Sequence, residues 1–188
     1  MKKLLLPLLI LGFSALLNQA LSQKMYMKVD APGYTFEGTS TDQGYEHQII
    51  VESFSEGLTG CSGVNSSVAG ACKTSLNAFS MITPLSFATI DFKSAMVQGK
   101  TLTAVNVVMV KTGGATSLAF YKIHMENVTI ASVQEGGSAG GGEPSISVSL
   151  SPMKIAWQVL TQDITGGPGN TSSYGWDFGK NSPFNYSF

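Results

Sequence analysis

Residues 118–133 read LAFYKIHMENVTIASV, and this stretch decides the fold class because apolar and polar side chains alternate through much of it. Tyr121, Ile123 and Met125 are separated from one another by a lysine and a histidine. A period of two residues is typical of a β-strand that turns one face toward a core. The stretch therefore predicts a long, half-buried strand.

Strands on either side of this segment continue the pattern. Thr103–Thr112 is rich in valine, as expected for a strand buried on both faces, and Gly113–Gly114 predicts a turn into the long strand. Gly136–Gly142 predicts a flexible loop, after which Ser145–Val159 alternates apolar residues with serines for part of its length. Pro152 lies inside this last segment and predicts a bulge or bend, because proline cannot donate a ladder hydrogen bond.

The remaining segments predict shorter strands and one helix. Strands are expected at Met25–Val29, His47–Phe54, Leu76–Thr83 and Tyr174–Phe178. Ser86 suits a helix N-cap, and Gly99 suits the positive φ of a helix end. Between them, apolar side chains recur at helical spacing, including Phe87, Ile90, Val97, Ala88, Phe92, Ala95 and Met96. The prediction is a mainly β fold, an antiparallel β-barrel or sandwich with one α-helix.

The N-terminal segment predicts export. Lys2 and Lys3 precede an almost wholly apolar run, Leu4–Leu17, and Ala20 and Ser22 supply the small side chains that signal peptidase needs. The run is short for a membrane span, although a retained N-terminal anchor is the alternative. We predict that residues 1–22 are a signal peptide and that residues 23–188 form one domain. The mature protein is then secreted or periplasmic in a bacterium.

Cys61 and Cys72 are the two cysteines of the chain, and small or polar residues separate them. In an oxidising compartment, two cysteines that close one flexible loop predict a disulfide. Metal binding is the alternative. Two thiols without neighbouring histidines fall short of a structural zinc site.

The sequence carries no pattern that indicates catalysis or a charged partner. Charged residues make up 12% of the chain and the formal net charge is −1, so nothing favours binding to nucleic acid or to an anionic membrane. His47 and His124 are the two candidate bases at neutral pH, and both are expected to be solvated strand residues. The glycine-rich segment 136–142 lacks the Lys-Ser/Thr of a phosphate-binding loop. We predict no enzyme activity, no cofactor and no metal.

An ordered set of segments resembles the haemolysin-coregulated protein (Hcp) family, which forms the inner tube of the bacterial type VI secretion apparatus. The segments are Tyr26–Asp30, Gly38–Thr41, Ile50–Gly57, Gln98–Lys100, Phe120–Val128, Val148–Leu150, Lys154–Ile155 and Tyr174–Asp177. The resemblance implies a small β-barrel with a flanking helix, assembled as a hexameric ring. It also implies that rings stack into a tube able to carry effector proteins, and that the cysteine loop contacts neighbouring subunits.

Two features depart from the family pattern. The family's tube subunit assembles in the cytoplasm and has no signal peptide, whereas the N-terminal pattern of this chain predicts one. The loop also lacks the basic residues common in the family and carries Cys61 and Cys72 instead. Both features fit a secreted relative of the tube subunit in an oxidising place.

Assembly is expected to involve the valine-rich strand and the long strand after it. Their backbone groups should face water at exposed edges unless a neighbouring copy pairs with them. The predicted assembly residues are Val105, Val107, Val108, Tyr121 and Ile123. The predicted function is therefore a non-catalytic, self-assembling ring or tube protein. The alternative is a secreted binding or adhesion module that uses its Gly- and Ser-rich loops.

Overall fold

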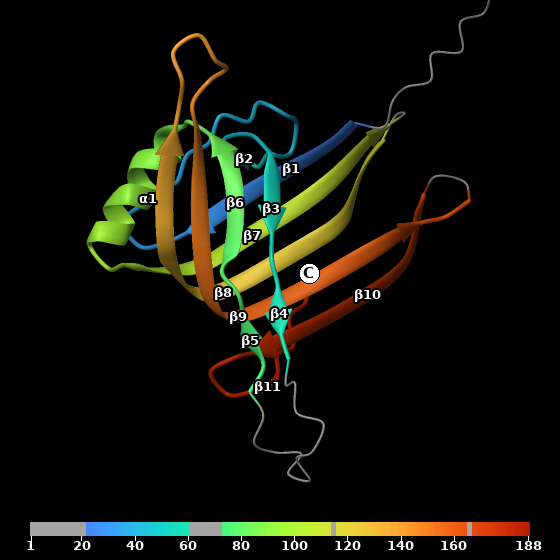
Figure 1. Ribbon diagram of the computed structural model, residues 1–188. Coiled ribbons are helices and arrows are strands. Elements are labelled where there is room, and N and C mark those ends of the chain that lie inside the picture. The colour runs from blue at the N-terminus through green and yellow to red at the C-terminus, as the bar shows by residue number, and fades with distance from the viewer. Residues whose placement is uncertain (1–21, 61–72, 114–115, 165–166) are drawn as a thin grey trace, which may run out of the picture.

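The computed structural model describes residues 22–60, 73–113, 116–164 and 167–188 (Figure 1). In chain order its elements are β1 (Ser22–Asp30), β2 (Ile49–Ile50), β3 (Ser53–Ser55), β4 (Leu58–Thr59), β5 (Ser75–Leu76), β6 (Phe79–Pro84), α1 (Phe87–Val97), β7 (Thr101–Gly113), β8 (Thr116–Gly136), β9 (Ser145–Gln162), β10 (Pro168–Asp177) and β11 (Ser182–Pro183). The paired strands are antiparallel, and the described residues contain one helix, which confirms the predicted fold class.

The main sheet closes into a barrel where Val51 and Glu52 form hydrogen bonds to two different strands. Its order runs β2, β1, β7, β8, β9, and β9 also pairs with β6, which pairs with β3. Val51 N donates to Met25 O in β1 at 3.0 Å, and Glu52 N donates to Ile82 O in β6 at 2.8 Å. The prediction of one continuous strand over His47–Phe54 is therefore wrong, because the segment is divided between two partners as β2 and β3.

Apolar side chains from every wall fill the barrel. Ile123 and Met125 of β8 are buried, as are Ile146, Val148 and Leu150 of β9, which confirms the alternation expected for both strands. The core also contains Met27, Phe79, Met81, Leu102 and Ile155. Burying a side chain of this size contributes about 1.5–3 kcal/mol, so these residues contribute strongly to the subunit's stability.

The helix has the predicted bounds but turns a narrower face to the core than its apolar sequence suggests. Ser86 is the N-cap of the helix, and Gly99, just past the C-terminal end of the helix, has φ +62°. The buried residues are Ala88, Thr89, Phe92 and Ala95, and the Phe92 ring lies 4.9 Å from that of Phe36. Phe87, Ile90 and Val97 stay 76%, 66% and 84% exposed. The apolar residues of the helix therefore lie on two faces, and only one of these faces packs against the core.

β8 and β9 are long strands that bend together (Figure 1). The first part of β9 pairs with β6 and its last part, from Lys154 onward, pairs with β10. Pro152 lies between these parts but pairs with Val128 without a register shift. Of the bulge or bend predicted at Pro152, the bulge is wrong, because the register shift occurs in β8, between Ile130 and Ser132.

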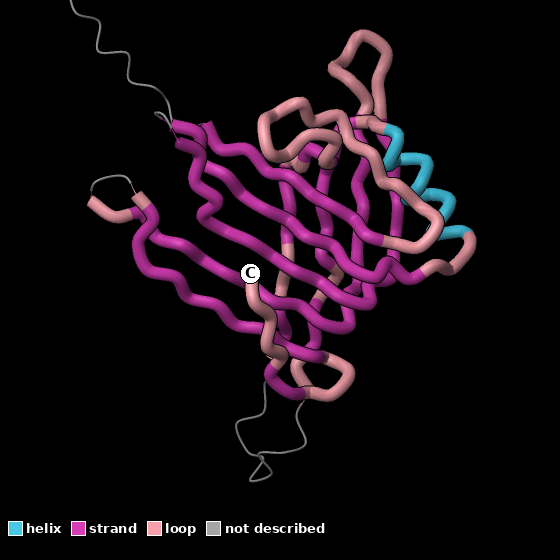
Figure 2. The backbone as a smooth tube through the Cα atoms, turned by 180° about the vertical axis from the view of Figure 1, so that it is seen from behind, coloured by secondary structure: helices cyan, strands magenta, loops and turns pink. Residues whose placement is uncertain are grey.

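β10 forms the far end of the sheet, and its outer edge is mostly open. β11 pairs only with Trp176 and Asp177, so within the described ranges Pro168–Tyr174 have no strand partner on the outer side. Beyond β11 the chain crosses over the sheet, and the C-terminus lies on its face (Figure 2). We call these last residues, Phe184–Phe188, the C-terminal strap.

Candidate functional site

The C-terminal strap covers the polar face of the sheet, on the side away from the barrel core. The Tyr186 ring stacks on the imidazole of His124, with centroids 3.6 Å apart and planes 9° apart. Phe184 N donates to Gly175 O at 2.9 Å, and Lys154 Nζ lies 4.9 Å from the centre of the Phe184 ring. The strap therefore begins at the edge of β10 and reaches across β9 to β8.

His124 lies beneath this strap in a hydrogen-bonded cluster. Its Nδ1 is 2.7 Å from Asn106 Oδ1 and its Nε2 is 3.4 Å from Glu126 Oε1, while Lys154 Nζ donates to Glu126 Oε2 at 2.9 Å. His124 is 5% exposed, so the expectation of a solvated histidine is wrong. Burial lowers its pKa, although the neighbouring Glu126 carboxylate opposes the shift.

Glycine at position 175 allows the strap to approach. A Cβ atom on Gly175 would stand 2.3 Å from Phe184 O and 3.1 Å from the Cβ of Ala156. The first contact is too short for a real side chain, and the second is tight, since carbon atoms pack at about 3.5–4.0 Å. Small residues on β9 and β10 thus leave the space that the strap fills.

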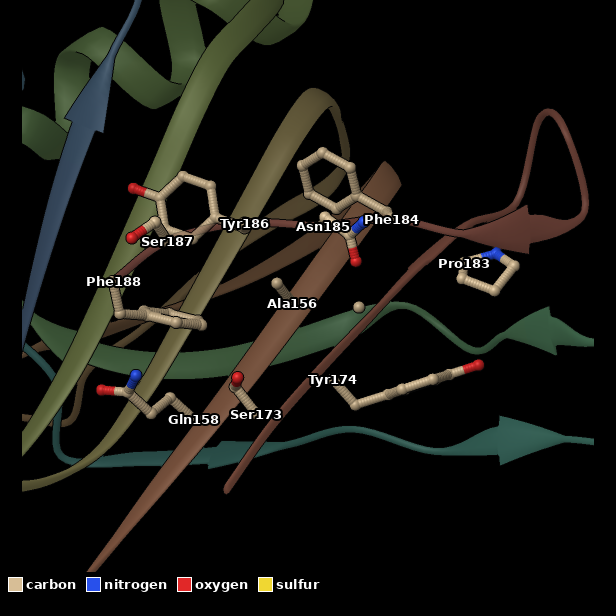
Figure 3. A pocket seen from close by; sticks show the side chains of 11 residues that line it. Ala156, Gln158, Ser173, Tyr174, Pro183, Phe184, Asn185, Tyr186, Ser187 and Phe188 are labelled. Atoms are coloured by element: carbon tan, nitrogen blue, oxygen red, sulfur yellow. The ribbon is translucent and has the colours of Figure 1, made fainter. Parts of the chain in front are cut away.

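A cavity of about 510 Å³ remains between the strap and the sheet (Figure 3). The rings of Phe184 and Tyr186 lie on one side of it, with Gln158 and Ser173 across from them. The described side chains around it are aromatic, amide, hydroxyl or small, and none is an acid or a base near neutral pH. They provide shape and hydrogen bonds.

A smaller cavity of about 240 Å³ opens on the other face of the sheet, beside β10. Its lining is mostly aromatic and consists of Leu58, Thr74, Trp157, Tyr174, Trp176 and Phe178. Trp157 Nε1 donates to both carboxylate oxygens of Glu56, at 2.9 and 3.1 Å. Burial raises the pKa of Glu56 against the effect of this hydrogen bond. The Nε1 of Trp176 is buried and has no partner among the described residues.

The residues predicted for assembly occupy two different environments. Val105, Val107 and Ile123 are 0%, 2% and 1% exposed, within the barrel core, whereas Val108 and Tyr121 are partly exposed. β7 already pairs with β1 and β8, and β8 pairs with β7 and β9. Along the five predicted assembly residues, these two strands therefore lack the expected free edges. β10, in contrast, has an outer edge that is mostly open.

The remaining site predictions concern the two cysteines and metal ligands. Cys61 and Cys72 lie outside the described residues. Among the residues that the structure does describe, no three His, Cys, Asp or Glu side chains gather as metal ligands. Nor does the helix found in those ranges have the length and apolar character to cross a membrane.

The strap is the structural feature that sequence reasoning missed. Its five residues, Phe-Asn-Tyr-Ser-Phe, alternate aromatic and polar side chains, which is the signal that could have revealed it. The open edge of β10 had no comparable signal, because which strand is last in a sheet depends on the pairing of all the others.

Comparison with known proteins identifies the fold. Residues 26–159 match the family model described as "Type VI secretion system effector, Hcp". A solved type six secretion system protein is 23% identical with a TM-score of 0.77, covering 87% of this chain and 100% of its own. Hcp1 from Salmonella typhimurium is 21% identical with a TM-score of 0.69, again covering 87% and 100%.

A type VI secretion system effector from Yersinia pestis is 23% identical, with a TM-score of 0.62 and coverage of 81% of this chain and 98% of its own. These likenesses concern the fold. No curated protein matches the chain in sequence. The family match spans more than half of the sequence. The chain therefore belongs to the Hcp family, the structural ring and tube proteins of the bacterial type VI secretion system.

Proposed function

We propose that this chain works by assembling into a closed ring of six copies that stacks into a tube able to carry effector proteins, without catalysing a reaction. The observation that carries the proposal is the sheet's unlike ends. β10 lies at one end with an open outer edge, and β2 and β1 lie at the other. When one patch of each copy pairs with a different patch of the next copy, the copies form a ring if the rotation from copy to copy closes on itself. Closure also covers an edge that would otherwise template uncontrolled pairing.

The open edge of β10 presents specific backbone groups. Gly175 O points outward, because it accepts a hydrogen bond from Phe184 N in the strap. Outward-pointing residues alternate along an antiparallel strand, so the N–H and C=O of Ser173 face the same way. Ser173 is exposed, and its backbone is therefore available to a neighbouring copy. The partly exposed Val108 and Tyr121 remain proposed assembly residues through side-chain packing.

The test is a proline at this position. Ser173→Pro removes an outward N–H and leaves the ladder to β9 intact, because proline is tolerated where the N–H faces solvent. We expect a subunit with unchanged β circular dichroism whose mass in light scattering falls from that of a ring to that of a monomer. Ser173→Thr is the matched control and should keep the ring. A folded Ser173→Pro protein with the full ring mass would refute β10 as the assembly edge.

The proposal includes export of the subunit to the periplasm or the outside of the cell. Residues 1–22 would be removed as a signal peptide, leaving Gln23 first, because Ala20 and Ser22 fit the cleavage pattern. N-terminal sequencing of the protein recovered outside the cytoplasm tests this. A sequence that starts at Met1 would overturn it.

A disulfide between Cys61 and Cys72 is the last part of the proposal. The bond would stiffen its loop and contribute about 3 kcal/mol by the chain-entropy estimate, while the barrel core holds the fold without it. Thiol labelling of denatured, non-reduced protein should find no free thiol. Loss of the whole β circular-dichroism spectrum on reduction would show that the bond supports the barrel as well.

A further inference from the structure

The path of the C-terminal strap is unexpected for its sequence. β11 pairs with β10 in a fixed register, Pro183 opposite Trp176, and the next hydrogen bond, from Phe184 N to Gly175 O, continues it. The same register would place Tyr186 opposite Ser173 along the open edge. The alternation of aromatic and polar residues in the strap suits such an edge strand. The strap instead leaves the edge after Phe184.

The contacts on the face of the sheet account for this departure. Tyr186 stacks on His124 in β8, which is two strands away from β10 in the sheet order. Tyr186 also packs edge-on against Phe188, with ring centroids 4.9 Å apart. Stacked aromatic pairs of this kind contribute about 0.5–1.5 kcal/mol beyond their buried area. The imidazole of His124 is thus the anchor that holds the strap across the sheet.

Two positions of one segment therefore compete. On the face of the sheet, the strap leaves the outer N–H and C=O groups of Ser173 open. Along the edge, it would satisfy those groups itself, which is how proteins commonly protect a strand edge. A neighbouring copy and the strap cannot both pair with the same backbone groups.

We propose that docking of the C-terminal strap on His124 keeps the edge of β10 open for a second copy of this chain, and that the released strap pairs with β10 and closes that edge. This inference rests on the proposed ring assembly through β10. The strap and the neighbouring subunit then compete for the same edge of β10. Stacking on His124 removes the strap from this competition.

Releasing the strap and then shortening it tests the inference. His124→Gln keeps a hydrogen-bonding group beside Asn106 but removes the stacking ring. We expect assembly about tenfold weaker than wild type, corresponding to roughly 1.4 kcal/mol, in light scattering across a concentration series. A second change in the same protein, a stop after Phe184, removes the competing residues and should restore the ring. His47→Gln is the matched control, because His47 has a 77% exposed side chain and lies in a loop.

Amide hydrogen exchange supplies an independent readout. At a concentration low enough that both variants are monomeric, the amide of Ser173 should exchange more slowly in His124→Gln than in the shortened double variant, since the strap covers it only in the former. Equal exchange, or a His124→Gln ring as stable as wild type, would overturn the inference. Failure of the shortened double variant to assemble would also overturn it, since loss of the competitor should restore pairing. A wild-type protein that never forms rings would instead refute the proposed function, so the two failures are distinct.

Discussion

The barrel and the β10 end of this subunit are held by different kinds of contact. In the barrel, β7 and β8 have both edges paired, and side chains such as Phe79 and Met125 are fully buried. At the β10 end, the outer edge is mostly open. The covering strap is held by a stacked pair of rings, a backbone hydrogen bond and a contact between Lys154 and the Phe184 ring. Dense apolar packing fixes the barrel, whereas the β10 end retains groups that a partner can use.

This difference separates stability from assembly. Substitutions in the barrel should unfold the subunit, because they remove packed apolar volume. Substitutions at the β10 end should leave a folded subunit and change what pairs with its edge. The predictions below test that separation in order of decreasing effect.

The largest effect is expected from Phe92→Ala in the helix. Phe92 is 1% exposed and packs on Phe36, so its removal should lower the free energy of unfolding by about 3–5 kcal/mol. Phe87→Ala is the control on the same helix, where a 76% exposed ring should cost less than about 0.5 kcal/mol. Urea unfolding followed by circular dichroism measures both. Similar losses for the two variants would mean that the exposed helix face is packed in the subunit.

An intermediate effect is expected from Gly175→Ala. The added Cβ would collide with Phe184 O, so the strap must move, at a cost of about 1–3 kcal/mol. Gly142→Ala has no atom within 4 Å of the new Cβ and should stay within about 0.5 kcal/mol of wild type. Limited proteolysis should release the C-terminus of Gly175→Ala while the barrel resists cleavage. Cleavage within the barrel at the same rate would contradict the separation of the two regions.

The smallest effect is a pH dependence of the strap. The pKa of His124 is lowered by burial, so the folded state favours the neutral imidazole. Glu126 and Asp30 face it and favour the charged form, while Lys154 opposes it. The stabilisation is therefore complete above pH 6.5, the ordinary value, and is lost as pH falls from there toward the lowered pKa.

Unfolding experiments at pH 7.5 and pH 5.5 measure this contribution. Wild type should lose stability between the two values, and His124→Gln should lose less, since glutamine does not titrate. An identical loss in both proteins would assign the pH dependence to other groups.

The sequence predicts the barrel well because its signals are local. The alternation around Ile123 and the capping of the helix by Ser86 and Gly99 depend on neighbouring residues, and the structure has both. The two apolar faces of the helix could not be ranked from sequence. Phe87 and Phe92 are equally apolar, and only the position of the sheet determines which is buried.

The β10 end could not be predicted because its contacts join distant segments. His124 is polar and lies on the polar side of its strand, and Tyr186, 62 residues later in the chain, returns to cover it. The prediction of free edges on the valine-rich strand and on the long strand after it fails for a similar reason. Valine content indicates a strand, but whether that strand is central depends on partners such as β1 and β8.

The mass of the mature protein in solution tests the central claim most directly. Light scattering on residues 23–188 across micromolar concentrations should give about six times the subunit mass, with closed rings visible by electron microscopy. Closure predicts a mass of six subunits, or of whole multiples of six where rings stack, because every β10 edge is paired within its ring. A monomeric mass at all concentrations would contradict the account, and so would open filaments that grow without limit.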